Sequence, residues 1–390
     1  MPDWMTQPDG PVLERLEWLT DVIPSFAGGE QRRALRAGPR RFFEFEAALS
    51  GAARRTVENL LHSGQAVQWR LPVWPDAVPL ASAVSASATA IPAATTGRDF
   101  AAGREVALVV DATRYEVRTI ASLTSAEITL AAGTASAWPA GSTLVVPLRP
   151  AFIAASLSLS RFTGADALAR WRFEVVGPND WTAETPATTY RSHPVLTAAP
   201  NWTEDPQHTL ERSLDRVDNG TGPAFFLDAA AAGPQRLQTH RWLLDGRTQI
   251  DAFRQWLHAR RGRLAAFWLP TWALDLEVAA SIGASDTTID VAHCAYSAAV
   301  AQGIGRRDIR IETVGGAVFY RRITASTEVS ATVERLTLDS ALGAALAPAD
   351  ILAVSFMSLA RLEADAVEIQ WQTADLAESV ATTRAALNDL

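Results

Sequence analysis

The residues that most often carry out chemistry in proteins are sparse and widely separated in this sequence. The histidines show no spacing that would place two imidazoles on one metal ion; they are His62, His193, His208, His240, His258 and His293. The sequence also contains no Walker loop, dinucleotide-binding glycine motif, nucleophile elbow or His-Glu-x-x-His stretch. We therefore expect no metal site, no cofactor and no enzymatic activity. A hydrolase would need an acid and a base that the sequence does not pair.

The remaining local candidates have ordinary structural interpretations. The stretch "DRVDNGTG" (215–222) brings Asp215, Asp218 and Asn219 together, but it lacks the oxygen spacing of a calcium loop, so a turn is favoured. Cys294 is the only cysteine, cannot form a disulfide within one chain, and is predicted to be a small buried apolar residue. None of these residues is expected to act in a reaction.

Arginine and tryptophan offer binding chemistry instead. All 35 basic residues are arginine, and "EQRRALRAGPRR" (30–41) is dense in them although the net charge is −8. That charge argues against a general nucleic-acid-binding protein. Arginines and the 13 tryptophans are typical of protein interfaces. The candidate interface residues are Trp18, Arg32, Arg33, Arg36, Trp181, Trp202, Arg260, Arg261 and Trp272.

Some of these candidates have a second interpretation. Arg260 and Arg261 stand at the predicted end of a helix, where they either complement the helix dipole or form a salt bridge across a subunit boundary. Tryptophan beside asparagine, at 179–181 and 201–202, is compatible with a sugar-binding face. We rank assembly above sugar binding.

The elements that position these residues are predicted to form a repeat. "WRLPVW" (69–74) and "FWLPTW" (267–272) align with an offset of 270 − 72 = 198. Helical patterns precede them at 51–64 and 246–262, and each of these follows a strand-like run, at 40–49 and 235–244. The unit is therefore strand, helix, strand. Pro72 and Pro270 are expected to end a central strand, and Trp74 and Trp272 to cap the core or face a neighbour.

Further short β-like runs follow each unit, separated by turn residues as in an antiparallel sandwich or barrel. The closing strands are matched as 167–176 and 366–374. The fold class is thus mainly β with a few helices, as a duplicated antiparallel β-sandwich or barrel domain with one flanking helix per copy. The predicted divisions are an N-terminal arm (1–39), a first β-rich domain (40–178), a connector (179–234), a second β-rich domain (235–374) and a C-terminal tail (375–390).

The length of 390 residues with 48% hydrophobic composition allows two or three domains. The sequence contains no run of 18 uncharged apolar residues, and its first residues do not resemble a signal peptide. We therefore expect no membrane insertion and synthesis in the cytoplasm.

Three stretches together resemble tail proteins of long-tailed, non-contractile bacteriophages. They are "LEWLTDVIPSFAGGEQRRALRAGPRRFFEFEAAL" (16–49), "GRLAAFWLPTWALDL" (262–276) and "LEADAVEIQW" (362–371). The resemblance covers most of the chain, but it carries no catalytic residue. It implies a β-sandwich domain of the tail-tube type with one flanking helix, in a structural protein of the virion tail tip.

This resemblance sets the expected partners. The chain is expected to form a homo-oligomeric ring at the distal end of the tail tube, to contact the tail tube protein and hub proteins, and to let DNA pass through a neutral or acidic lumen. A trimer is favoured over a hexamer, because three chains with two like domains supply six similar positions. The alternative is a carbohydrate-binding tail accessory protein that contacts the host surface.

Overall fold

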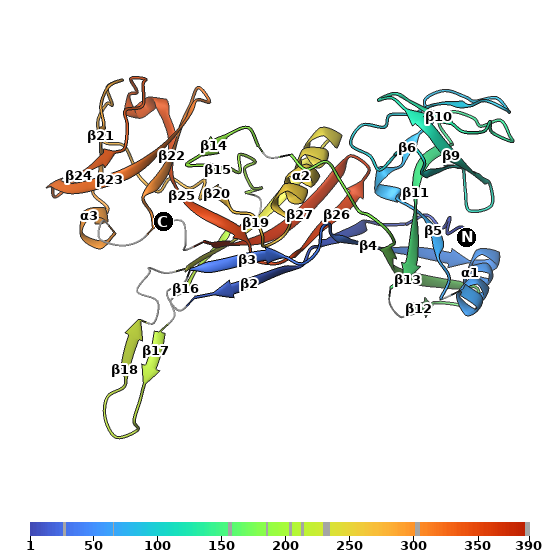
Figure 1. Ribbon diagram of the computed structural model, residues 1–390, viewed down its shortest axis with the longest axis horizontal. Coiled ribbons are helices and arrows are strands. Elements are labelled where there is room, and N and C mark those ends of the chain that lie inside the picture. The colour runs from blue at the N-terminus through green and yellow to red at the C-terminus, as the bar shows by residue number, and fades with distance from the viewer. Residues whose placement is uncertain are drawn as a thin grey trace.

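The computed structural model describes residues 1–25, 29–64, 66–154, 158–184, 186–202, 205–211, 214–228, 235–300 and 305–386. Within them the protein is mainly β with a large antiparallel sheet, which confirms the predicted fold class at that level. The molecule is elongated, with a β-rich lobe at each end and a sheet between them (Figure 1). Its α-helices are α1 (Gly51–Gly64), α2 (Arg247–Arg260) and α3 (Tyr296–Ala299).

An antiparallel sheet, called here the central sheet, runs through the middle of the molecule. Its strands, in spatial order, are β12 (Ser158–Arg161), β13 (Asp166–Val175), β4 (Arg40–Ser50), β1 (Val12–Glu17), β26 (Ala366–Thr373), β27 (Leu376–Ala385), β19 (Gln235–Asp245) and β16 (Gln207–Glu211). Buried and more exposed residues alternate along β1 and β13, so one face of the sheet packs on a core and the other is polar.

A second layer covers the apolar face of the central sheet. It contains α1, α2 and the elements β5 (Trp69–Pro72), η1 (Trp74–Asp76), β11 (Leu144–Ile153), β20 (Phe267–Pro270) and β25 (Ile351–Leu362). Strand β5 pairs with β11, and β20 pairs with β25. Large aromatic side chains fill the space between the layers, among them Trp4, Trp69, Trp171, Trp242 and Trp371.

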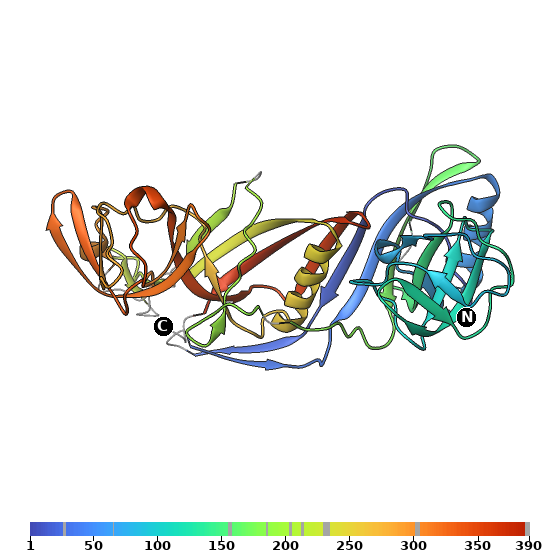
Figure 2. The same cartoon turned by 90° about the horizontal axis from the view of Figure 1, so that it is seen from above.

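Two outer lobes extend from the second layer, and each has a hydrophobic core of its own. The first outer lobe (78–145) contains β6 (Val78–Pro79), β7 (Ala90–Pro92), β8 (Glu105–Val109), β9 (Tyr115–Leu123) and β10 (Glu127–Leu130). The second outer lobe (276–356) contains β21 (Thr288–Ala292), α3, β22 (Asp308–Thr313), β23 (Val318–Ser330), β24 (Val333–Leu338) and η2 (Pro348–Asp350). Seen from above, the lobes lie at opposite ends of the molecule (Figure 2).

Three hairpins complete the described chain. They are β2 (Thr20–Pro24) with β3 (Glu30–Ala34), β14 (Thr189–Tyr190) with β15 (His193–Pro194), and β17 (Leu214–Val217) with β18 (Phe225–Asp228). The β2–β3 hairpin lies along the central sheet, whereas the β17–β18 hairpin projects away from the body of the molecule (Figure 1).

The main strands and the first two helices follow a similar order, with similar pairings, in the first half (12–175) and the second half (207–385) of the chain. Strand β4 pairs with β1 and β13 and is followed by α1; β19 pairs with β16 and β27 and is followed by α2. In the outer lobes β10 pairs with β7 and β9, as β24 pairs with β21 and β23. Pro72 faces Leu148 and Pro270 faces Met357 in equivalent ladders. Superposition of the two halves tests the predicted duplication.

The pairings show strands of the central sheet in several of the predicted divisions outside the two β-rich domains. Strand β13 corresponds to β27 and not to β26, because both β13 and β27 pair along their length with the strand that precedes a helix. The predicted C-terminal tail therefore contains a full strand of the central sheet. The predicted N-terminal arm likewise contains β1, and Trp4 near its start is buried. The predicted connector contains β14 to β18, of which β16 belongs to the sheet.

Candidate assembly interface

The two halves of the chain meet where β1 pairs with β26. Val12 faces Trp371 and Glu17 faces Ala366, so the backbone ladder of the central sheet runs from one half into the other without a break. Strand β1 also pairs with β4 on its other edge. The junction therefore depends on an early strand that is held between the two halves.

A buried charge cluster fills this junction; its members are Glu14, Arg41, Asp76, Asp99 and Arg254. From α2, Arg254 donates to Oε2 of Glu14 at 2.7 Å and to Oδ1 of Asp76 at 3.1 Å. From β4, Arg41 donates to Oε1 of Glu14 at 2.8 Å and to Asp99 at 2.5 Å. One carboxylate from the first half is thus shared by an arginine from each half.

Aromatic rings enclose the same cluster. The indole Nε1 of Trp371 donates to Oε2 of Glu14 at 2.9 Å. The guanidinium of Arg254 lies 4.6 Å from the ring of Trp371 and 4.7 Å from that of Trp181. Burial alone would raise the pKa of Glu14, but the charges of Arg254 and Arg41 outweigh it and lower that pKa to about 2. Glu14 is therefore ionised, and its charge is balanced across the junction.

The β2–β3 hairpin forms a second contact between the halves. Arg361 on β25 donates to both carboxylate oxygens of Glu30, at 2.8 and 2.7 Å. Beyond β25, Asp365 accepts from the backbone N–H of Thr20 at 2.6 Å and from that of Arg263 at 2.9 Å. A bidentate arginine-carboxylate pair fixes both partners in orientation. The hairpin of the first half is therefore fastened to the second half.

Several predicted interface residues belong to these contacts within the chain. Trp18 is buried, with its ring edge-on to His258 at 5.5 Å. Arg261 donates to the carbonyl oxygens of Arg36 and Ala37 at 3.1 and 3.0 Å. Trp18 and Arg261 therefore make contacts between the two halves of one chain.

The other candidates are divided between the interior and the surface. Trp181 donates from Nε1 to Asp251 at 3.0 Å. Buried Arg260 donates to the carbonyl of Ala266, and Trp272 packs edge-on to His240 at 5.5 Å. On the surface, Arg33 lies 3.8 Å from Asp21 with 76% of its side chain exposed, Arg32 on β3 is intermediate in exposure, and Trp202 is 54% exposed. Arg33 and Trp202 are therefore the candidates most accessible to another molecule.

Sites considered for other chemistry have structural roles. Asp218 accepts from the backbone of Gly220 and pairs with Arg216, as a turn residue does. Asn179 is buried and accepts from Arg149 at 3.0 Å, so its amide is engaged within the chain. The expectation for Cys294 was wrong: it is exposed, because the chain there loops over Glu334, whose carboxylate accepts from the backbone N–H of Cys294 at 3.0 Å.

Sequence reasoning missed the central residues of the junction. Glu14 lies in an ordinary polar run, "LERLE", that gives no sign of burial. Arg254 did give a signal, because it lies on the apolar face of α2, one turn after Ile250 and directly after Phe253. An arginine on such a face needs a buried carboxylate as partner.

The polar face of the central sheet carries matched charges. Arg170 lies 3.6 Å from Glu44, and Arg172 lies 3.4 Å from the same carboxylate. Across the β1–β26 ladder, Arg15 donates to Glu368 at 3.1 Å. This face is therefore neutral on average and rich in ion pairs.

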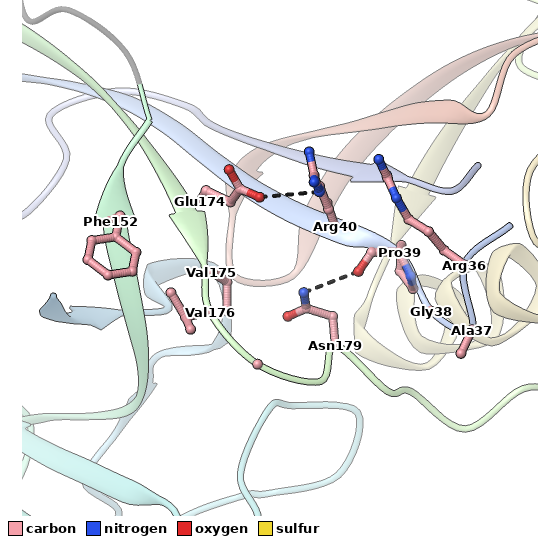
Figure 3. A pocket seen from close by; sticks show the side chains of 11 residues that line it. Arg36, Ala37, Gly38, Pro39, Arg40, Phe152, Glu174, Val175, Val176 and Asn179 are labelled. Carbon is pink, nitrogen blue, oxygen red and sulfur yellow. Dashed lines mark hydrogen bonds and ion pairs between the residues drawn. The ribbon is translucent and has the colours of Figure 1, made fainter.

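A groove of about 530 Å³ opens beside β4 and β13 in the first half. Arg40 and Glu174 form an ion pair at 3.5 Å on one side of it, while Phe152 lies on the other side with 40% of its surface exposed. Figure 3 shows Phe152 separated from Arg36 and Arg40 across this groove. An exposed aromatic ring beside charged side chains is typical of a protein contact.

Buried histidines are expected to make the protein acid-sensitive. Burial, followed by the charge of Arg41, lowers the pKa of His258 to about 4, and burial with the charge of His208 does the same for His240. Since the unfolded chain binds these protons near pH 6.5 and the folded protein does not, stability present above pH 6.5 is lost as pH falls toward 4. Urea unfolding between pH 7.5 and 4.5 measures this loss.

The matched variants are His258→Gln and His62→Gln. The first removes a buried titrating ring and should flatten the dependence of stability on pH across that window. The second changes the exposed histidine at the matched helix position and should leave the dependence as it is. Equal slopes for wild type and His258→Gln would contradict the assignment.

No family model matches the chain, and a search of curated proteins found no match either. Among the described residues, no helix is both long and apolar enough to cross a membrane. The described part of the chain also contains no cluster of three His, Cys, Asp or Glu side chains arranged to hold a metal ion.

Proposed function

We propose that the protein is a structural virion subunit that forms a ring at the distal end of a phage tail tube. The observation that carries this proposal is the central sheet, in which two similarly connected halves are joined by a strand pairing and end in open edges. In the ring the protein takes part in assembly and in the passage of DNA. Its partners are copies of itself, the tail tube protein and tail hub proteins.

The copy number follows from the two halves. Three chains supply six similar positions, which fits a three-fold hub on a six-fold tube, and six chains are the alternative. The polar face of the central sheet suits a lumen, because its arginines are already paired with carboxylates such as Glu44 and Glu368 and leave little net positive charge for phosphates.

Labelled virions and native mass spectrometry test this proposal. Antibody against the chain, viewed by negative-stain electron microscopy on virions of the phage that encodes it, should label the tail tip. The isolated ring should have the mass of three chains, and a mass of six chains would overturn only the copy number. Label confined to the capsid, or absent from virions, would overturn the function.

The alternative of a carbohydrate-binding accessory protein has less support. Asn179 and Trp181, one of the two pairs that favoured it, are hydrogen-bonded within the chain. At the other pair, Trp202 is exposed but lies on the connection that leads into β16. No observation on the described residues favours a sugar over a protein partner there.

A further inference from the structure

The central sheet has one open edge at each end. Within the described residues β12 pairs only with β13 along its length, and β16 pairs only with β19. Every residue of β16 is exposed, and β12 is exposed except at Leu159. Open edges present unpaired backbone donors and acceptors that accept a further strand.

The chain already contains the junction that would close these edges. Strand β16 corresponds to β1, because each pairs with the strand before a helix on the edge opposite to β27 or β13. Strand β12 corresponds to β26, because they pair with β13 and β27 respectively. Inside the chain β1 and β26 pair, with Glu14 opposite Ile369. The equivalent residues are His208 on β16 and Leu159 on β12. The free edges of β16 and β12 are thus the counterparts of β1 and β26, which pair with each other inside the chain.

The charges at the two free edges are also complementary, but there the helix contributes a carboxylate instead of an arginine. Arg254 is the eighth residue of α2, and the eighth residue of α1 is Glu58. Arg41 on β4 faces Leu16, and its counterpart Arg236 on β19 faces Leu210. Inside the chain, an arginine on α2 meets a carboxylate on β1. Between chains, a glutamate on α1 of one copy would instead meet an arginine on β19 of the other.

The groups at these two ends are partly exposed. The side chain of Glu58 is 21% exposed, where it pairs with Arg54 and with Arg161 of β12. Arg236 is partly buried, and the charges of Arg306 and Asp275 act on its guanidinium in opposite directions. Burial lowers its pKa, so an incoming carboxylate would relieve an unfavourable charge.

The second hairpin supports the same arrangement. The β2–β3 hairpin is fastened to Arg361 of the next half, whereas the β17–β18 hairpin exposes Phe225, Phe226 and Leu227, at 65%, 63% and 58%. The first-half counterpart of Arg361 is Phe152, which is exposed in the groove of Figure 3. A two-stranded hairpin with apolar side chains in solvent is marginally stable alone. Its apolar residues match the exposed ring of Phe152 at the receiving position.

We propose that copies of this chain assemble head to tail, with β16 of one copy pairing antiparallel with β12 of the next and the β17–β18 hairpin lying over the groove at Phe152. The central sheet then continues from chain to chain, and each contact between chains repeats the contact inside the chain. Its closure into a ring rests on the proposed function, but the edge pairing does not. A head-to-tail contact forms a closed ring when the rotation between neighbouring copies is a whole fraction of a turn.

Charge reversal tests the pairing. Glu58→Arg places two arginines together and Arg236→Glu two glutamates, so each variant should associate at least about tenfold more weakly than wild type, measured by light scattering and native mass spectrometry. The double variant restores opposite charges and should assemble as wild type does. Glu127→Arg, on an exposed position of β10 in the first outer lobe, is the matched control and should assemble normally.

A mixture of the two single variants also reports the copy number. In the mixture, every contact between chains brings opposite charges together only if the two variants alternate around the ring. An even number of chains allows this alternation, and three chains do not. A closed ring from the mixture therefore indicates six chains, whereas its absence beside a restored double variant indicates three.

The outcomes separate the pairing from the function. Single variants that assemble like wild type, or a wild-type chain that stays monomeric at high concentration, would overturn the edge pairing. A restored double variant together with virions unlabelled at the tail tip would leave the pairing standing and overturn the function. Circular dichroism of the dissociated variants checks that they are folded.

Discussion

Replacing Arg254 by methionine should lower the free energy of unfolding by about 3–5 kcal/mol, the usual cost of removing one partner from a buried ion pair. The methionine fills much of the same volume, but buried Glu14 then keeps only Arg41 as an arginine partner, and Asp76 keeps Arg247 but loses Arg254. Chemical denaturation at pH 7 measures the change. Arg254→Lys should recover only part of it, because an ammonium group cannot bridge both carboxylates as a planar guanidinium does.

The control for this change is Arg33→Met. Arg33 is an arginine of the β2–β3 hairpin whose side chain is 76% exposed and lies 3.8 Å from Asp21. Exposed pairs of this kind contribute about 0–1 kcal/mol. If Arg254→Met costs no more than Arg33→Met, the charge cluster does not stabilise the junction.

Replacing Trp4 by alanine should cost about 3–5 kcal/mol, as is typical for a large aromatic removed from a core. Its ring lies edge-on to Trp69 and Trp171 at 5.2 Å each, and to Phe173 at 5.3 Å. The indole Nε1 has no hydrogen-bond partner among the described residues, so Trp4→Phe should cost clearly less. Thermal unfolding followed by near-UV circular dichroism suits this test, since the signal comes from the same aromatic cluster.

Trp202→Ala serves as the comparison, because Trp202 is 54% exposed and should change stability by less than about 0.5 kcal/mol. Similar losses for the two tryptophans would mean that the N-terminal residues are not part of the core, in line with the original expectation of an arm. A large loss for Trp4 alone would place the start of the chain in the folded first half.

Local patterns were sufficient to predict the two strand-helix-strand units. The run at 40–49 alternates as a strand should, and the helix at 51–64 begins and ends at glycine; both agree with the structure to within a residue. The Leu-Pro motif predicted the strands that end at Pro72 and Pro270. These features depend on neighbours in the sequence, where periodicity and turn residues carry the information.

Features that depend on distant partners were not predictable. Strand β1, "VLERLE", spaces its apolar residues no more like a strand than like a helix, and it becomes a strand because β4 and β26 lie on either side of it. Strand β27 is rich in alanine and threonine and follows β26 after a tight turn, so it was taken for a tail. The burial of Glu14 depends on Arg254, which lies 240 residues away in the sequence.

The position of β1 has a consequence for synthesis on the ribosome. Residues 12–17 are translated long before their partners on β26, residues 366–371. Until β26 has been made, the nascent first half therefore keeps an unpaired strand edge and an exposed Glu14. Long-range pairing of this kind folds slowly, and the open edge is competent to capture β26 from a neighbouring chain on the same polysome. Concentrated expression should therefore favour strand-exchanged dimers, and slower or cooler translation should favour the correctly closed chain.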